Sequence, residues 1–177
     1  DRNRFAKYSS FGRWLREKLE KFLCRKSDLV ITVNDSIAEI LADRYEIPKP
    51  TIVMNIPARK VSSTLSENDR NLRLLLNIQT GHKVLLYSGA ITFNRGLETL
   101  IKALVIMPNC HLVMMGFGSK DFKTKLRQIA LEDGVGDRFD FFGPVSSADV
   151  TSYAASADIG VAPIENVCLS YYLCSPN

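Results

Sequence analysis

Residues 83–103 read KVLLYSGAITFNRGLETLIKA, and this stretch decides the fold class. It opens with an apolar run from Val84 to Tyr87, turns at Gly89, and continues after Gly96 with apolar residues at helical spacing. A short apolar run fits a strand that is buried on both faces of a parallel sheet. The stretch therefore predicts a strand, a turn and a helix, which together begin a βαβ unit.

The same alternation continues on both sides of this stretch. The expected strands are residues 28–33, 51–54, 83–88, 111–115, 138–142 and 158–163. The apolar, β-branched run of 28–33 also fits a strand that is buried on both faces of a parallel sheet. The expected helices are residues 13–26, 37–45, 71–80, 96–107, 122–133 and 148–156, the second of them capped within 34–36. Strands and helices that alternate with short connections are typical of parallel sheets covered by helices. We therefore expect an α/β fold with a Rossmann-like parallel sheet.

A polar segment separates two series of strands and helices. Residues 58–70 show no apolar period, so we interpret them as an interdomain linker or a surface loop. The predicted division is 1–57 for the end of a first domain, 58–80 for the linker and a leading helix, and 81–177 for a second domain.

The charge of the chain limits the classes of partner. The formal net charge is +4 and no block of consecutive Lys and Arg occurs, so we expect no nucleic-acid partner. The basic residues of 13–26 alternate with apolar ones, which predicts an amphipathic helix. Such a helix either docks on a domain or lies on an anionic membrane surface, and we prefer docking because globular helices are built this way too.

The cysteines point to a reducing compartment. Cys24, Cys110, Cys168 and Cys174 form no C-x-x-C pair and do not accompany clustered histidines, so we expect no zinc or other metal site. Without a secretory signal or an apolar run of about 18 residues, free thiols in the cytosol are expected. The chain begins at Asp1 and not at methionine, so we expect an internal fragment.

One strand-to-helix turn suits a diphosphate. In open α/β sheets, ligands lie beyond the carboxyl ends of the strands. Gly89 would let a phosphate approach the backbone, the following helix offers free N–H groups, and Arg95 can bind phosphate oxygens bidentately. The alternative is an ordinary turn with a solvated arginine.

Two further turns follow later strands. Gly116-Phe117-Gly118 lacks the third glycine of the dinucleotide fingerprint, so it either lines a ligand cleft or only turns the chain tightly. Phe141 to Val145 precedes a helix whose cap we expect at Ser146 or Ser147. Backbone polar groups beside Val145 would suit a planar base, although an ordinary connection explains them as well.

The titratable residues give one candidate. His82 and His111 form no recognisable acid/base pair, and we expect both to be structural or solvated. Glu165 follows the last strand, where a carboxylate can bind ligand hydroxyls or act as an acid or base. A solvated loop glutamate is the alternative interpretation.

The order of these turns resembles the retaining glycosyltransferases of the GT-B fold, in family four. Residues 27–34 resemble the last strand of the amino-terminal acceptor domain, and 84–103 resemble the opening of the carboxy-terminal donor domain. Residues 115–118, 141–145 and 153–163 resemble later donor-domain signatures, in the right order. The resemblance covers nearly the whole chain. It makes 1–57 the end of an acceptor domain and 81–177 an incomplete nucleotide-sugar-binding domain.

The resemblance implies transfer of a sugar from a nucleotide-diphosphate sugar to an acceptor hydroxyl with retention of configuration. The setting would be synthesis of cell-surface polysaccharide or glycolipid, with a saccharide or lipid-linked acceptor, in the cytoplasm or on the inner face of the membrane. Gly89 and Arg95 would face the diphosphate, Gly116 would border the cleft, and the backbone around Val145 would read the base. Members of this fold generally work without a bound metal or other cofactor.

The chain departs from the family at two places. Ala90 stands where the family often has arginine, which leaves Arg95 as the main cationic group. The family also carries two glutamates separated by seven residues, and the chain ends at Asn177, before the second of them. Glu165 therefore cannot be equated with the first, the catalytic residues stay unassigned, and we expect the fragment to be inactive alone.

Two other classes of protein compete with the transferase. One is a non-catalytic module that binds a nucleotide or a sugar phosphate on the same α/β architecture. The other is a response-regulator-like interaction domain, which ranks last because the expected cluster of acidic residues at a strand end is absent.

Overall fold

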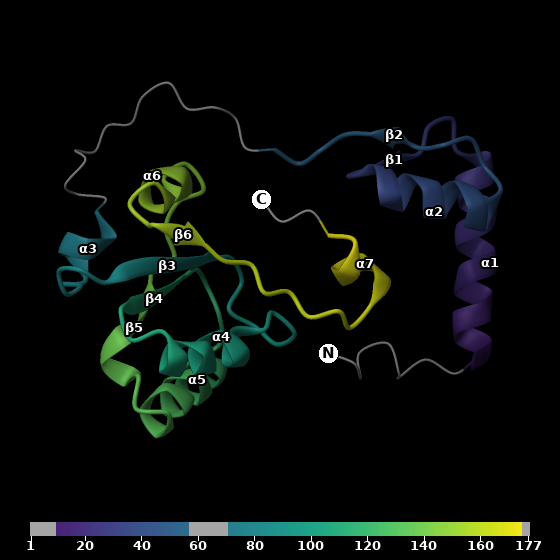
Figure 1. The fold of residues 1–177 in the computed structure, drawn as a ribbon. Coiled ribbons are helices and arrows are strands. Elements are labelled where there is room, and N and C mark those ends of the chain that lie inside the picture. Colours follow the sequence, from purple (N-terminus) through teal and green to yellow (C-terminus); the bar gives the residue numbers. More distant parts are fainter. Residues whose placement is uncertain (1–9, 57–70, 175–177) are drawn as a thin grey trace. The chain divides into compact units, whose positions relative to one another are not determined.

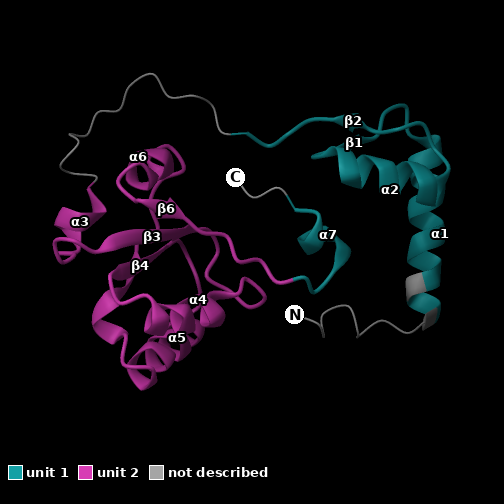
Figure 2. Cartoon of the chain, in the orientation of Figure 1, with its two compact units in different colours: residues 1–59, 166–177 teal, residues 60–165 magenta. Residues whose placement is uncertain are grey.

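The computed structural model describes residues 10–56 and 71–174 (Figure 1). The chain forms two compact units, of which unit 1 comprises Asp1–Arg59 with Asn166–Asn177 and unit 2 comprises Lys60–Glu165 (Figure 2). The predicted linker 58–70 lies outside the described residues. The predicted division into 1–57, 58–80 and 81–177 therefore stays a prediction.

Unit 2 is built on a four-stranded parallel sheet. In spatial order the strands are β5 (Phe139–Phe142), β4 (Cys110–Met115), β3 (Lys83–Ser88) and β6 (Ile159–Gly160). All of the pairings are parallel, so the carboxyl ends of the four strands share one edge of the sheet. The expected α/β fold with a parallel sheet is confirmed.

Helices cover both faces of this sheet. They are α3 (Leu72–Leu75), α4 (Leu97–Ala103), α5 (Lys120–Glu132) and α6 (Val150–Ala154), with the short 3₁₀ turns η2 (Leu104–Ile106) and η3 (Gly136–Arg138). Figure 1 shows α4 and α5 on one side of the strands and α6 on the other. Alternate residues of β3 and β4 point to opposite faces, which gives two apolar cores. Strands buried on both faces explain the continuous apolar runs.

Three helices of unit 2, α3, α4 and α6, are shorter than the sequence pattern predicts. α3 ends at Leu75 because Asn77 adopts a left-handed conformation, with φ 50°, which stops the helix. The α-helical part of α4 ends at Ala103, and η2 follows before Pro108. The residue before a proline avoids the helical region, and Met107 has φ −123°.

The predicted serine cap of α6 is wrong. The helix begins after Asp149, and the hydroxyl of Ser146 bonds the Asp149 carboxylate at 2.5 Å. The carbonyl oxygen of Ser146 accepts from the backbone N–H groups of Asp149 and Val150. The serine therefore stabilises the turn before the helix through its backbone and does not cap the first helical N–H with its side chain.

Unit 1 contains α1 (Ser10–Lys26), β1 (Ile31–Thr32), α2 (Asp35–Tyr45), β2 (Thr51–Ile52) and α7 (Leu169–Tyr172). The predicted cap of α2 is confirmed, since Asn34 Oδ1 accepts from the backbone N–H of Ile37 at 2.9 Å. The side-chain nitrogen of Asn34, Nδ2, donates to the carbonyl oxygen of Leu173 at 2.7 Å. The sequence pattern did not predict α7.

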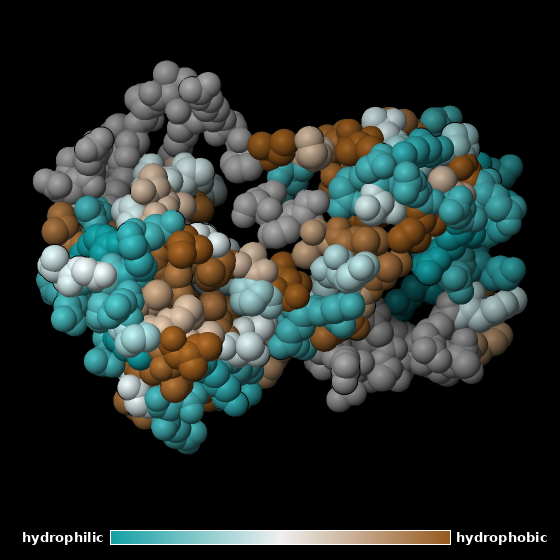
Figure 3. Space-filling view, in the orientation of Figure 1, coloured by the Kyte–Doolittle hydropathy of each residue, from teal (hydrophilic) through white to brown (hydrophobic). Residues whose placement is uncertain are grey.

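The prediction that strand 28–33 is buried on both faces is wrong. β1 pairs only with β2 in the described part of unit 1, and Leu29 and Ile31 are 62% and 55% exposed. No described element covers these side chains, so they meet solvent. Figure 3 also shows hydrophobic residues along the segment after β2, where Val53 and Met54 are exposed.

The helix predicted over 13–26 is confirmed as α1. Its charged side is in view in Figure 3, and its apolar side chains are more than half exposed: Phe11, Trp14, Leu15, Leu19, Phe22 and Leu23. At its carboxyl end, Lys21 bonds the Glu46 carboxylate at 2.6 Å and Arg25 donates to the Tyr45 carbonyl at 2.9 Å. Among the described helices, none is both long and apolar enough to cross a membrane.

Asp158 joins the start of β6 to β3. Its carboxylate accepts from the Val84 backbone N–H at 2.7 Å and from Lys83 Nζ at 3.1 Å, and it also bonds the Arg73 guanidinium. The Val84 N–H, and then the Lys83 and Arg73 charges, hold the pKa of this carboxyl below its ordinary value. The folded state therefore favours the charged form of Asp158.

This shift predicts a pH dependence of stability. Because the pKa is lower in the folded chain than in the unfolded chain, the contribution of Asp158 is fully present above the unfolded pKa, about 3.9. It is lost as the pH falls through the lower folded pKa. We expect Asp158→Asn to lower the free energy of unfolding at neutral pH and to bring the variant closer to the wild type in acid. Urea unfolding at a series of pH values measures this difference.

The matched control is Asp137→Asn, which removes an exposed carboxylate of η3. We expect it to follow the wild-type stability at each pH. A constant difference between Asp158→Asn and the wild type, from neutral pH down into acid, would contradict the role given to the Asp158 charge.

Candidate functional site

Two glycine turns meet at the carboxyl edge of the unit 2 sheet. The backbone N–H of Gly89 donates to the carbonyl oxygen of Met115 at 3.0 Å. The backbone N–H of Gly116 donates to the carbonyl oxygen of Phe142 at 3.1 Å. A Cβ atom on Gly116 would lie 2.0 Å from the carbonyl oxygen of Gly89. The two turns therefore touch backbone to backbone, and only glycine permits this approach.

The pairing of β3 and β4 continues beyond these glycines. The N–H of Ile91 donates to the carbonyl oxygen of Phe117 at 2.8 Å, and Ile91 forms a parallel bridge with Gly118. A Cβ atom on Gly118 would lie 2.4 Å from the Ile91 carbonyl oxygen. The first two turns are thus fixed against each other, while Gly89 remains exposed to solvent.

Arg95 lies in a loop that is held against the segment after β6. The residues on either side of it are left-handed, with φ 61° at Asn94 and φ 67° at Gly96. A Cβ atom on Gly96 would lie 2.1 Å from the carbonyl oxygen of Pro163, and the Glu165 N–H donates to the Asn94 carbonyl at 3.2 Å. The loop that carries Arg95 and the segment that carries Glu165 are therefore neighbours.

Val145 follows the third turn. Gly143 has φ 75°, and a Cβ atom added to it would lie 2.8 Å from the backbone nitrogen of Val145. The half-buried Val145 side chain packs on the core that α3 and α6 cover. Through the hydrogen bond from Gly116 to Phe142, this turn adjoins the second one.

The structure thus gathers all five candidate residues, Gly89, Arg95, Gly116, Val145 and Glu165, at one edge of the sheet. The two histidines lie toward the opposite edge. His111 is buried near the start of β4 and its Nε2 lies 2.9 Å from Asp140 Oδ2, which fits the structural role expected of it. His82 precedes β3, and its carbonyl oxygen accepts from Arg73 at 2.7 Å.

Two residues at this edge were missed by the sequence analysis. Lys123 Nζ donates to the carbonyl oxygen of Gly116 at 3.3 Å, which brings a second cation to the glycine turns. Helical side chains lean toward the amino end of their helix, so a lysine one turn into α5 was predictable from its position. The side-chain nitrogen of Asn94 is buried without a hydrogen-bond partner among the described residues, and no sequence signal distinguishes it from an ordinary turn asparagine.

The electrostatics of this edge favour anions. α5 begins here, with the Ser119 hydroxyl accepting from the Phe122 N–H at 3.3 Å, so the positive end of its dipole faces the second turn. Arg95 and Lys123 add two side-chain charges. Backbone N–H groups, a helix amino end and cations are the usual binders of phosphate oxygens. In the part of the chain that the structure describes, no three His, Cys, Asp or Glu side chains lie together as metal ligands.

Comparison with known sequences identifies relatives. The model of a family described as glycosyl transferases group 1 matches residues 69–169. The chain is 29% identical over 141 residues to an uncharacterised glycosyltransferase of Methanocaldococcus jannaschii, covering 76% of this chain and 36% of that protein. It is 24% identical over 171 residues to the alpha-monoglucosyldiacylglycerol synthase of Streptococcus pneumoniae, covering 89% and 38%. The chain therefore spans less than two fifths of the length of these relatives.

Solved structures show the same fold. Sucrose-phosphate synthase from Thermosynechococcus elongatus aligns with a TM-score of 0.65 and 21% identity over 94% of this chain and 42% of its own. HepE of Anabaena, solved with UDP and glucose, aligns with a TM-score of 0.67 and 19% identity over 88% and 42%. At this identity the likeness concerns the fold alone, and it confirms the Rossmann-like arrangement of the GT-B type.

Proposed function

The chain belongs to the glycosyl transferases group 1 family, and from this premise we propose that the carboxyl edge of unit 2 binds the nucleotide diphosphate of a sugar donor. The observation that carries the proposal is the backbone contact between the Gly89 and Gly116 turns, beside Arg95. The contact leaves a surface without side chains at the point where phosphate oxygens would approach the backbone. The whole protein would then be a glycosyltransferase that uses this donor.

The diphosphate would lie on the Gly89 turn. The Arg95 guanidinium can bind two phosphate oxygens at once, and the amino end of α5 adds a positive field. Lys123 lies at the neighbouring turn and offers a further cation to a site in which Ala90 replaces the arginine that the family often carries. These fixed charges would stabilise the leaving diphosphate without a metal ion.

The remaining candidates would bind the other parts of the donor. The backbone around Val145 would read the edge of the base, while its half-buried side chain offers apolar contact. Glu165 is exposed beside the Arg95 loop, where its carboxylate could accept hydrogen bonds from donor hydroxyls. We assign no catalytic residue.

The reaction that we propose for the whole protein is transfer of a hexosyl or related group to an acceptor hydroxyl with retention of configuration. The acceptor would be a saccharide or a lipid-linked saccharide of a cell-surface polysaccharide or glycolipid. The name of the Streptococcus pneumoniae relative specifies a glycolipid product. The four free cysteines suit the cytoplasm, and the basic α1 with its exposed apolar side suits contact with the inner membrane face.

Replacing Arg95 by alanine tests the donor site. We expect calorimetric titration of the chain with UDP, GDP and ADP to detect one preferred nucleotide. Arg95→Ala should weaken its binding at least about tenfold, because hydrogen bonds to charged groups contribute roughly 1.5–3 kcal/mol each. Turnover of a nucleotide sugar by the whole protein then separates a transferase from a module that only binds a nucleotide or a sugar phosphate.

The control for charge alone is Lys102→Ala. Lys102 is exposed in the last turn of α4, away from the glycine turns, so its removal should leave nucleotide affinity unchanged. Equal affinities for wild type and Arg95→Ala would remove Arg95 from the donor site.

A further inference from the structure

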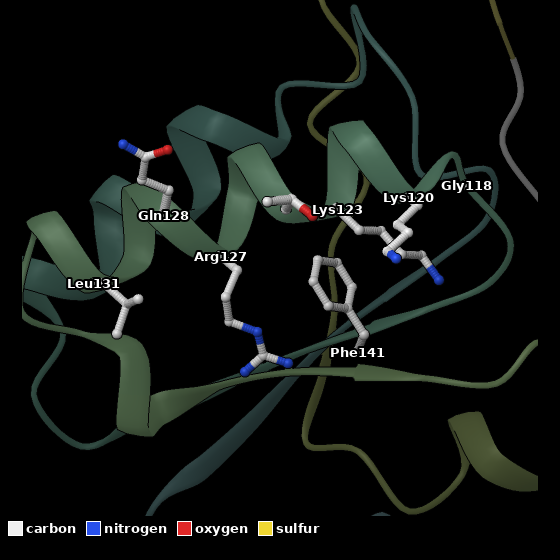
Figure 4. Close-up of a pocket in the computed structure, with 8 residues that line it drawn as sticks. Gly118, Lys120, Lys123, Arg127, Gln128, Leu131 and Phe141 are labelled. Atoms are coloured by element: carbon white, nitrogen blue, oxygen red, sulfur yellow. The ribbon is translucent and has the colours of Figure 1, made fainter.

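A groove runs along the outer side of unit 2, between α5 and the edge strand β5. Its volume is about 510 Å³, and it begins at Gly118 and passes along one side of α5 over the Phe141 ring (Figure 4). Lys120, Lys123 and Arg127 line it, and the structure shows no Asp or Glu among the lining residues. We call this feature the α5 groove.

The three cations of the α5 groove form no ion pair with a carboxylate of the described residues. Six other cations of the described chain do pair with carboxylates: Lys21, Arg25, Lys49, Arg73, Lys83 and Lys125. Lys125 is the useful comparison. It lies on the same helix, outside the groove, and bonds Glu98 at 3.1 Å. The groove therefore concentrates positive charge that the described part of the protein does not neutralise.

The arrangement of these cations lowers the stability of α5. Lys120, Lys123 and Arg127 are three and four residues apart, so they share one side of the helix and repel one another. Lys120 and Lys123 also lie near the amino end of α5, where the helix dipole disfavours positive charge. An anion bound in the groove would relieve both effects. The charge of these side chains therefore suits a bound anion.

Phe141 holds two of the cations in place. Lys123 Nζ lies 5.3 Å and Arg127 Cζ lies 5.5 Å from the centre of the Phe141 ring. Arg127 also lies over the Phe139 ring at 5.7 Å. Figure 4 shows the Lys123 and Arg127 side chains extending toward the Phe141 side of the groove. Cations that are already positioned lose less entropy when they bind an anion.

We propose that the α5 groove binds a ligand with two or more phosphate groups, at a second site beside that of the donor diphosphate. Lys123 borders both sites, whereas Lys120 and Arg127 line the groove alone. Its volume lies in the range of small-molecule sites, roughly 300–1,000 Å³. Its cations are spread over two turns of α5, which suits several phosphates better than one. Free diphosphates and the clustered headgroups of anionic lipids share this chemistry. The proposal does not depend on the assignment of Arg95.

The first experiment is titration of the full chain with inorganic pyrophosphate at constant ionic strength. The test variant is Lys120→Gln with Arg127→Gln, and the control is Lys125→Gln, which removes a charge from the same helix outside the groove. We expect at least about a tenfold loss of pyrophosphate affinity in the test variant and little change in the control. Amide NMR shifts in the wild type should fall on residues 118–128. Thermal unfolding checks that each variant is folded.

Two results would overturn the proposal. One is a folded test variant that binds pyrophosphate as tightly as the wild type. The other is a set of NMR shifts confined to residues 89–96, which would place pyrophosphate only at the donor edge. UDP titration of the same variant keeps the two proposals apart, because its UDP affinity should remain when its pyrophosphate affinity is lost.

A second experiment identifies the source of the phosphates. The chain is sedimented with vesicles of equal parts phosphatidylcholine and phosphatidylglycerol, with and without pyrophosphate. Co-sedimentation that requires Lys120 and Arg127 and that pyrophosphate reverses would support lipid headgroups as the ligand. Pyrophosphate binding without such co-sedimentation would support a soluble ligand. If neither pyrophosphate binding nor co-sedimentation with vesicles depended on Lys120 and Arg127, the proposed site would be rejected.

Discussion

Replacing Gly116 by alanine should lower the free energy of unfolding by more than about 3 kcal/mol. The new Cβ atom would lie 2.0 Å from the carbonyl oxygen of Gly89, which belongs to the backbone and cannot move aside as a flexible side chain would. Gly116 also has φ 150°, a conformation that alanine rarely adopts. The Gly89 turn must therefore separate from the Gly116 turn. Urea unfolding measures the loss, and UDP titration should show that the separated turns no longer bind nucleotide.

The control for backbone conformation is Gly81→Ala. Gly81 also has a positive φ, 94°, but an added Cβ atom would meet nothing within 4 Å. Its substitution should therefore cost about 1 kcal/mol, the strain of the backbone alone. If Gly116→Ala were no more destabilising than Gly81→Ala, the close contact between the two turns would not contribute to the structure of this edge.

The sequence predicted the central elements of unit 2 well. β3 has the predicted bounds, 83–88, and β4 and α5 differ from expectation by a residue or two. In these elements the period of apolar residues and the neighbouring glycines indicate the same structure. α3 was predicted over 71–80 and stops at Leu75 because a single left-handed residue, Asn77, ends it. Apolar periodicity does not report such a local conformation.

Burial in unit 1 was harder to predict. The apolar run 28–33 has the composition of a strand covered on both faces, yet β1 pairs with one strand in the described chain and its apolar side chains are exposed. Composition indicates that a strand can be buried on both faces, and burial follows only where other elements cover those faces. The same holds for α1, whose apolar stripe was predicted and whose exposure was not.

The site was predictable to the extent that it follows strand ends. Each of the three glycine turns comes directly after an apolar run, and parallel strands bring such turns to one edge. The contact between the Arg95 loop and the segment after β6 was not predictable in this way. It depends on β6 lying next to β3, and the two strands are separated in sequence by β4 and β5. Long-range strand order is not encoded in local periodicity.

The contact between the Arg95 loop and the segment after β6 predicts a second large loss of stability, on substitution of Gly96. A Cβ atom here would lie 2.1 Å from the carbonyl oxygen of Pro163, so Gly96→Ala must push the start of α4 away from the segment after β6. We expect a loss of about 2–4 kcal/mol in the free energy of unfolding. Because Arg95 precedes Gly96, its guanidinium should also move. Calorimetric titration should show nucleotide affinity at least about tenfold weaker, although every atom of Arg95 is retained.

Gly134 provides a matched control, because its φ of 68° equals that of Gly96 within a degree and an added Cβ atom would meet nothing within 4 Å. Gly134→Ala therefore carries the same backbone strain without the clash, and it should lose about 1 kcal/mol of stability and no nucleotide affinity. The difference between the two variants isolates the contact with Pro163. If Gly96→Ala lost stability but kept full affinity, the position of Arg95 would not depend on that contact, and its role at the diphosphate would have to rest on the Arg95→Ala result alone.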